Sequence, residues 1–288
     1  MEWYVFAFGS AVLGAISAII EKKTLLKENP LEFSTVLALF NALISLPILF
    51  FVSWSISYSL LLLIYLVSIL ATIAFYLVSK ALRHMNISIE SPLLNFETVI
   101  LVVLASLVLG EAVSKIQLAG ILIIVISGYL LELPKNLNFK TPIRVFLKSK
   151  SIHMIFIAMV LYAFTSIGDK VVLGYIEPIK YILIAQVFIS INFVIMISIF
   201  QNGLHSIRHG IRNAGKYVLL TAIFTTSYRL LQATATSMAL ISLVIPIKKL
   251  STVISTFFGG ELFHEKRVIF KSLIALVMVF GAVLIILG

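Results

Sequence analysis

Four charged residues of this sequence stand inside long apolar stretches, where a charge is unfavourable. Glu97 interrupts NFETVILVV, and Arg229 lies in SYRLLQATA. Lys248 and Lys249 interrupt LVIPIKKLSTV. An ionised side chain in a hydrocarbon environment costs several kcal/mol, so such residues usually pair with one another or line a binding site. Lysine and arginine there can hold a phosphate or carboxylate group, and a carboxylate can pair with them or exchange a proton.

Two interpretations are open for Glu97 and the two lysines. In the first, one ion pair simply holds two helices together. In the second, the residues line a polar cavity and bind a substrate, alone or with a proton exchanged at Glu97. One ion pair would leave one lysine without a partner, which favours the second interpretation. Because successive residues on a helix point about 100° apart, we expect one lysine to pair with Glu97 and the other to face the cavity.

Neighbouring polar residues extend this set. Arg229 can grip a carboxylate or phosphate with two parallel hydrogen bonds, or it can pair with a helix or reach the interface. We add Tyr228, Asn95 and Tyr76 as hydrogen-bonding candidates, although amides in membranes also join helices. With Glu90 counted, the interior holds three bases and two acids. This balance favours an anionic or zwitterionic substrate over a cationic drug.

Other polar residues receive structural interpretations. Glu111 and Glu265 end apolar stretches, and we expect them to act as helix stops or caps. His205 and His209 have a spacing that could bind a metal on a helix. Glycines at 203 and 210, with no acid nearby in the sequence, favour a loop facing lipid headgroups. No metal or other cofactor is therefore expected.

The elements that must position these residues are membrane-spanning helices. The 288 residues are 61% hydrophobic and 12% charged, with a mean hydropathy of +1.13, which is typical of a polytopic membrane protein. About ten helices of about 20 to 25 residues fit this length. The net charge of +10 comes from short basic segments beside apolar stretches, so it indicates membrane-flanking residues and not a nucleic-acid partner. We expect the first helix to be retained as a signal anchor.

The chain contains an internal repeat. Ser88–Glu111 aligns without a gap with Ser242–Glu265, and Glu21-Lys22 followed by Pro30 aligns with Asp169-Lys170 followed by Pro178. The sequence therefore predicts two five-helix repeats, residues 1–133 and 152–288, joined by a basic loop over 134–151. The expected helices are 3–20, 31–52, 58–79, 88–111, 116–133, 152–167, 179–200, 216–236, 239–258 and 268–287.

An odd number of helices in each repeat predicts inversion of the second repeat, as in many secondary transporters. Counted with the first turn of the helix that follows, the connections after odd-numbered helices hold 16 lysines and arginines, and those after even-numbered helices hold 3. The positive-inside rule then places the basic connections in the cytoplasm and both termini outside.

The paired blocks Pro92–Glu111 and Pro246–Glu265, with Gly120 and Gly128 in the helix that follows the first block, resemble the EamA-like ten-helix permeases of the drug/metabolite transporter (DMT) superfamily. The resemblance implies a membrane permease for small metabolites such as amino acids, nucleotide sugars or sugar phosphates. In phosphate-handling relatives a basic pair in the ninth helix holds the anion, and Lys248-Lys249 is similar to it. Members are usually described with cytoplasmic termini, in disagreement with the charge count.

The expected function is secondary transport of a small anionic or zwitterionic metabolite, by alternating access through a cavity between the two repeats. No GxxxxGK[ST] P-loop is present, so ATP is not the expected energy source, and proton coupling, exchange and uniport stay open. A lipid flippase or a helical scaffold is the alternative. An intramembrane enzyme is less favoured, because protease and HExxH patterns are missing. We expect a multi-pass protein of the cell membrane, as a monomer or homodimer.

Overall fold

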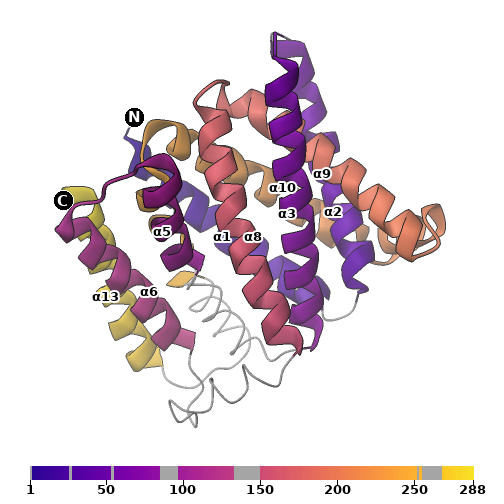
Figure 1. Ribbon diagram of the computed structural model, residues 1–288. Coiled ribbons are helices and arrows are strands. Elements are labelled where there is room, and N and C mark those ends of the chain that lie inside the picture. Colours follow the sequence, from indigo (N-terminus) through magenta and orange to yellow (C-terminus); the bar gives the residue numbers. More distant parts are fainter. Residues whose placement is uncertain are drawn as a thin grey trace.

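The computed structural model describes most of the chain, and helices are the regular elements of the part described (Figure 1). The described residues are 2–25, 28–52, 55–84, 97–132, 150–251, 253–254 and 268–288. The first half holds α1 (Trp3–Leu25), α2 (Pro30–Ser45), the 3-10 helix η1 (Leu46–Phe51), α3 (Tyr58–His84), α5 (Glu97–Leu109) and α6 (Lys115–Glu132). The second half holds α8 (Lys150–Leu173), α9 (Pro178–Phe200), α10 (Leu204–Met238), α11 (Ile241–Lys248) and α13 (Val268–Leu287).

The outer surface of the helices suits a membrane. Five described segments are long and apolar enough to cross one, namely α1, α2 with η1, α3, α8 and α9. Large apolar side chains such as Leu62, Leu107 and Leu276 are exposed on the outside, where lipid accepts them without the penalty that water imposes. The protein is an all-α polytopic integral membrane protein, which confirms the predicted fold class.

Prolines begin corresponding helices in the two halves. Pro30 opens α2 and Pro178 opens α9, at a helical position where the missing N–H would have no partner in any case. The Asn29 side chain accepts a hydrogen bond from Leu31 N at 2.9 Å and so caps α2. Glu177 precedes α9 without such a bond.

Several predicted boundaries are wrong. α1 continues to Leu25, α3 to His84 and α8 to Leu173, and the helix expected over 31–52 is an α-helix only to Ser45, with η1 after it. Glu21 and Asp169, which were expected to follow their helices, therefore lie inside them. The loop expected over 201–215 is also helical, because α10 begins at Leu204. Gly210 does not break this helix; it makes room for α2, since a Cβ there would lie 3.1 Å from Val36 Cγ2. Glycine in a helix can thus indicate close packing as well as a turn.

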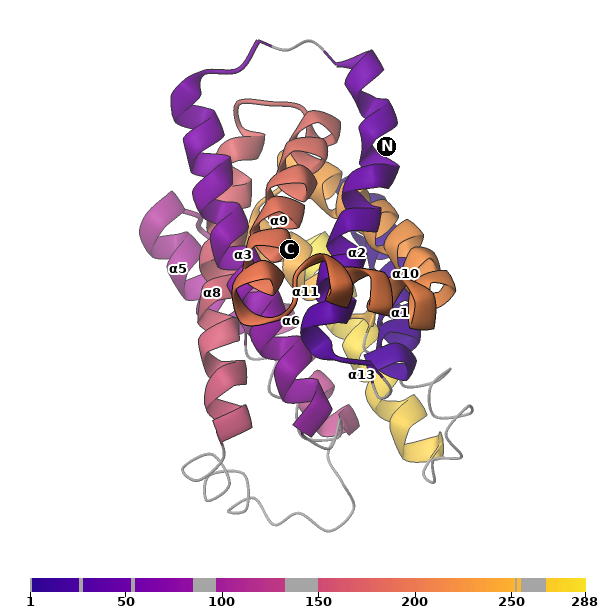
Figure 2. The ribbon, with the colours of Figure 1, turned by 90° about the vertical axis from the view of Figure 1, so that its right-hand side faces the viewer.

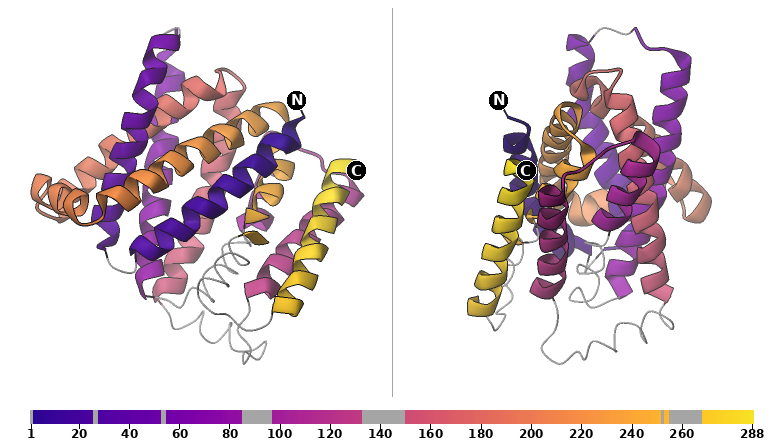
Figure 3. Two further views of the ribbon diagram at one scale, coloured as in Figure 1. Left: turned by 180° about the vertical axis from the view of Figure 1, so that it is seen from behind. Right: turned by 60° about the vertical axis from the view of Figure 1, so that its left-hand side comes forward.

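The two halves interleave. In the described residues α1 packs along α10 (Figure 3, left), and α3 packs along α8. The counterparts of α1, α2 and α3 in the second half are α8, α9 and α10. When each helix is replaced by its counterpart, the contact of α1 with α10 becomes that of α8 with α3, and the contact of α2 with α10 becomes that of α9 with α3. Figure 2 shows α9 between α2 and α3. This symmetry is the pattern expected of two related repeats, whose exact boundaries and orientation in the membrane stay predictions.

Small residues allow the closest helix contacts. Ala7, Ala11 and Ala15 form a fully buried stripe on α1, as their four-residue spacing predicts. At the contact of α6 with α13, a Cβ on Gly120 would lie 2.5 Å from Gly281 O. Glycine is therefore required at Gly120 by the backbone of the opposite helix.

Candidate functional site

The predicted ion pair between the halves is present. Lys249 Nζ lies 2.9 Å from Glu97 Oε2, and the two side chains are only 19% and 12% exposed. Glu97 is the first residue of α5, and Lys249 directly follows α11. Figure 3 (left) shows α11, in amber, ending midway along the height of the molecule. The pair thus joins the first half to the second well inside the helix bundle.

The second lysine points at a different helix, as the 100° rotation between neighbours predicts. Lys248 Nζ donates a hydrogen bond to Gln232 Oε1 of α10 at 2.5 Å. It also lies 4.9 Å from the centre of the Tyr228 ring, which is one helical turn before Gln232. Protein surrounds Lys248, yet part of its side chain stays accessible. Its contacts on α10 are a neutral amide and a ring face, which hold the ammonium group without neutralising it.

Arg229 lies next to Tyr228 on α10 and is also partly exposed. It is close enough to Asp169 of α8 and Tyr181 of α9 to interact with both electrostatically. The Tyr181 hydroxyl donates a hydrogen bond to Asp169 Oδ1. The neighbours of the guanidinium group on α8, α9 and α10 are one acid, Asp169, and three tyrosines, Tyr162, Tyr181 and Tyr228.

Glu21 is a third acid close to the candidate site. It stands in α1, near Tyr162 of α8 and Tyr228 of α10, and not in the polar connection that the sequence predicts. Around this site the described residues supply the acids Glu21, Glu97 and Asp169 and the bases Arg229, Lys248 and Lys249. The excess of bases inferred from the sequence is therefore not found around the site, and Glu90 lies outside the described residues.

The structure does not place the other two predicted binding residues, Tyr76 and Asn95, in this group. Tyr76 of α3 packs against a cluster that includes Ala38 and Phe193, and Lys80 Nζ lies 5.6 Å from the centre of its ring. Its role in binding stays a prediction. Asn95 lies outside the described residues.

Sequence reasoning missed Asp169, Tyr181 and Gln232 as members of the site. Asp169 is the single aspartate of the chain, and its pairing with Pro178 in the repeat suggested a helix end. Its place within α8 follows only from the length of that helix. Gln232 stands three residues after Arg229, on nearly the same face of α10, and this spacing was the available signal.

A separate polar network joins the helices away from the charged group. Gln186 of α9 accepts a hydrogen bond from Ser45 Oγ at 2.7 Å, and its Nε2 lies 3.4 Å from Thr226 Oγ1. Thr226 also donates to Asn41 Oδ1 at 3.3 Å. All four side chains are buried, so these amides act as contacts between α2, α9 and α10.

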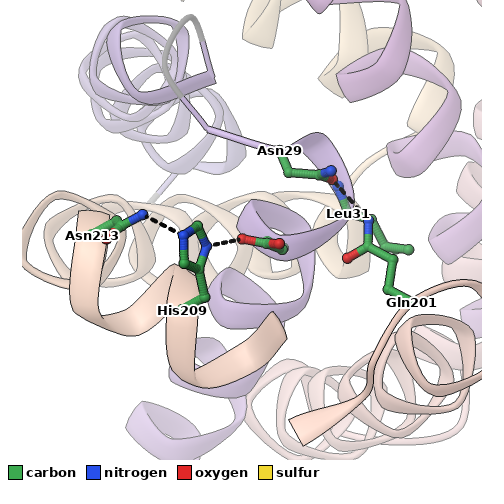
Figure 4. A network of polar contacts seen from close by, with 6 residues as sticks. Asn29, Leu31, Gln201, His209 and Asn213 are labelled. Carbon is green, nitrogen blue, oxygen red and sulfur yellow. Dashed lines mark hydrogen bonds and ion pairs between the residues drawn. The ribbon is translucent and has the colours of Figure 1, made fainter. Parts of the chain in front are cut away.

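His209 of α10 takes part in a surface network (Figure 4). Its Nδ1 lies 2.8 Å from Glu32 Oε2 of α2, and its Nε2 lies 3.0 Å from Asn213 Nδ2. Gln201 Nε2 donates to Asn29 Oδ1 at 3.2 Å. The sequence has no acid close to His209, but the fold brings Glu32 to it from a distant part of the chain. No group of three metal-ligating side chains occurs among the described residues.

Comparison with known proteins agrees with the helical architecture. Residues 1–133 match the sequence model of the EamA-like transporter family, which agrees with the resemblance for that part of the chain. A solved structure, titled only as a protein crystal structure, covers 99% of this chain and 96% of its own with a TM-score of 0.75. At 10% identity it shows the fold alone. No curated protein sequence matches the chain significantly.

Proposed function

We propose that the protein is a secondary transporter for a small metabolite that carries a phosphate or carboxylate group, because residues 1–133 match the EamA-like transporter family model and helices form the described remainder. The observation that carries this proposal is the position of Lys248. Its ammonium group lies inside the bundle, its hydrogen-bond partner Gln232 is neutral, and part of the residue is accessible. Glu97 and Asp169 also act on it electrostatically. A cation held in this way is ready to bind an anion.

Arg229 and Lys248 are the proposed binding groups for the anionic part of the substrate. They come from α10 and α11, and they interact electrostatically with each other. Gln232 and Tyr228 hold the lysine on the side of α10. Arginine adds two parallel donors that suit a carboxylate or a phosphate. Two cations that repel each other are stabilised when an anion lies between them.

The acids of the group favour an amine on the same substrate. Glu21 and Asp169 lie near Tyr228 and Arg229 respectively, and both remain partly accessible. With three acids and three bases around the site, a zwitterion such as an amino acid adds no net charge to it. Phosphate esters fit as a second class, with a proton taken up at one of the acids to balance the charge.

The Glu97–Lys249 pair supports alternating access between the halves. It joins α5 to the end of α11, midway across the molecule, which is where inverted-repeat transporters bind their substrates. Glu97 is also the proposed site of proton exchange, because protonation of its carboxyl group would release Lys249. We place the transporter in the cell membrane.

The test is substrate flux into proteoliposomes from a panel of amino acids and phosphate esters. We expect Lys248→Met and Arg229→Met each to lower flux at low substrate concentration about tenfold or more, since a charge-assisted hydrogen bond contributes about 1.5 to 3 kcal/mol. Lys115→Met, at the exposed start of α6, is the matched control and keeps full flux. Full flux in both site variants, with folded protein, would show that these residues do not bind the substrate.

A further inference from the structure

Glu111 makes an unusual contact between the two halves. It follows α5 after Gly110, whose φ of +66° turns the chain. Its Oε1 accepts a hydrogen bond from Ile241 N at 2.9 Å, and its Oε2 accepts from Ser242 N at 3.0 Å and from Ser242 Oγ at 2.6 Å. Glu111 is 7% exposed, and both its partners are buried. The expectation that Glu111 caps a helix is confirmed, and that helix belongs to the other half.

The capped helix, α11, lacks a cap of its own. Leu240 precedes it and has no side-chain oxygen to accept a hydrogen bond from the first N–H groups. The carboxylate of Glu111 satisfies two of these donors and lies at the positive end of the helix dipole. These bonds fix both the position and the rotation of the first turn of α11.

The other end of α11 carries the two lysines of the candidate site. The helix has eight residues, Ile241 to Lys248, and so is about 12 Å long. A helix of two turns behaves as a short rod, and a rotation at its start is transmitted to its end. Glu97 at the start of α5 holds Lys249, while Glu111 after the end of α5 holds Ile241 and Ser242. Both ends of α11 are therefore attached to the two ends of α5.

We propose that Glu111 is a positioning residue that sets the rotation of α11, and thereby decides that Lys249 meets Glu97 while Lys248 meets Gln232. A rotation of about 100° would exchange the directions of the two lysines. The binding role of the lysines rests on the proposed function, but their positioning by Glu111 does not. The residue acts at the end of α11 that is opposite to the two lysines.

The test measures which of the two lysines lies next to the Glu97 carboxyl group. A carbodiimide such as dicyclohexylcarbodiimide activates the Glu97 carboxyl group, and a lysine amine within contact then forms an amide with loss of water to the reagent. Proteolysis and mass spectrometry of the purified full chain give the yields of the Glu97–Lys249 and Glu97–Lys248 cross-links. We expect the wild-type protein to give mainly the Lys249 product, since its Nζ lies 2.9 Å from Glu97 Oε2.

Glu111→Gln keeps the shape of the side chain but replaces one acceptor oxygen with a donor. The ratio of the Lys249 to the Lys248 product should fall about tenfold, the factor that corresponds to loss of one charge-assisted hydrogen bond. Ser242→Ala removes only the hydroxyl bond and should lower the ratio in the same direction by less. Glu177→Gln, an exposed acid before α9 with no capping bond, is the matched control and keeps the wild-type ratio.

The product ratio separates positioning from general stability, because partial unfolding lowers both yields together. An unchanged ratio in folded Glu111→Gln overturns the proposal. If that variant does not fold, an unchanged ratio in Ser242→Ala overturns it as well. A shifted ratio with normal flux of amino acids and phosphate esters supports positioning by Glu111 and refutes the binding role of the lysines instead.

Discussion

The Glu97–Lys249 pair predicts a large and specific coupling between the two halves. We consider Glu97→Gln and Lys249→Met, which remove one charge each and keep the side-chain lengths, together with the double variant. The two groups lie 2.9 Å apart and are 12% and 19% exposed, so water screens them little. Each single variant leaves the other charge in the bundle without this partner.

The expected loss of unfolding free energy follows from the burial of the two side chains. Breaking a fully buried pair by removing one partner costs about 3 to 5 kcal/mol, and the partial exposure here reduces the expected loss to about 2 to 3 kcal/mol for each single variant. The double variant also removes the desolvation cost of the second charge. Its stability should therefore lie near that of one single variant, which gives a coupling energy of about 2 kcal/mol.

The assay is a double-mutant cycle of unfolding free energies, measured by denaturant titration in mixed micelles. The matched control is the cycle of Glu32→Gln and His209→Gln, because His209 is 54% exposed and such pairs contribute about 0.2 to 1 kcal/mol. Additive losses for Glu97 and Lys249, within about 0.5 kcal/mol, would refute the inference that this pair joins the halves energetically.

Two further predictions concern packing and orientation. Gly120→Ala should separate α6 from α13 and lower the melting temperature, because its Cβ would lie 2.5 Å from Gly281 O; Gly215→Ala, whose Cβ would meet only Ile211 Cγ2 at 3.6 Å, should be tolerated in the same thermal melt. Because the chain has no cysteine, Asn202→Cys and Tyr175→Cys can be labelled singly with an impermeant thiol reagent in intact cells. The charge count predicts labelling of Tyr175→Cys alone from outside, and the opposite result would reverse the orientation.

Local sequence information predicts the helices better than their partners. Proline positions, apolar stretches and the alanine stripe of α1 each have a local cause, and they place the starts of α2, α9 and α1 correctly. The pairing of one lysine with Glu97 is also predictable, since opposite charges in lipid must find each other. Because successive residues of a helix point about 100° apart, the two lysines are predicted to point in different directions. This spacing does not predict which of them contacts Glu97.

Contacts between distant parts of the chain explain the errors. His209 finds Glu32 at a separation of 177 residues, and no local pattern reveals that acid. Gly210 looks like a helix breaker until Val36 is seen to pack against it. The repeat that pairs Asp169 with Pro178 suggested a helix end, whereas the Tyr181 hydroxyl of the next helix donates a hydrogen bond to Asp169, which lies within α8.

The interleaved contacts of the two halves bear on how the protein is made. α1 packs along α10 and α3 packs along α8, so α1 and α3 have partners that are synthesised only later. A chain ending after α6 would leave the alanine face of α1 open to lipid, and to degradation. The two halves produced as separate polypeptides in one cell should instead assemble, because these contacts join helices directly and do not depend on the covalent connection between the halves.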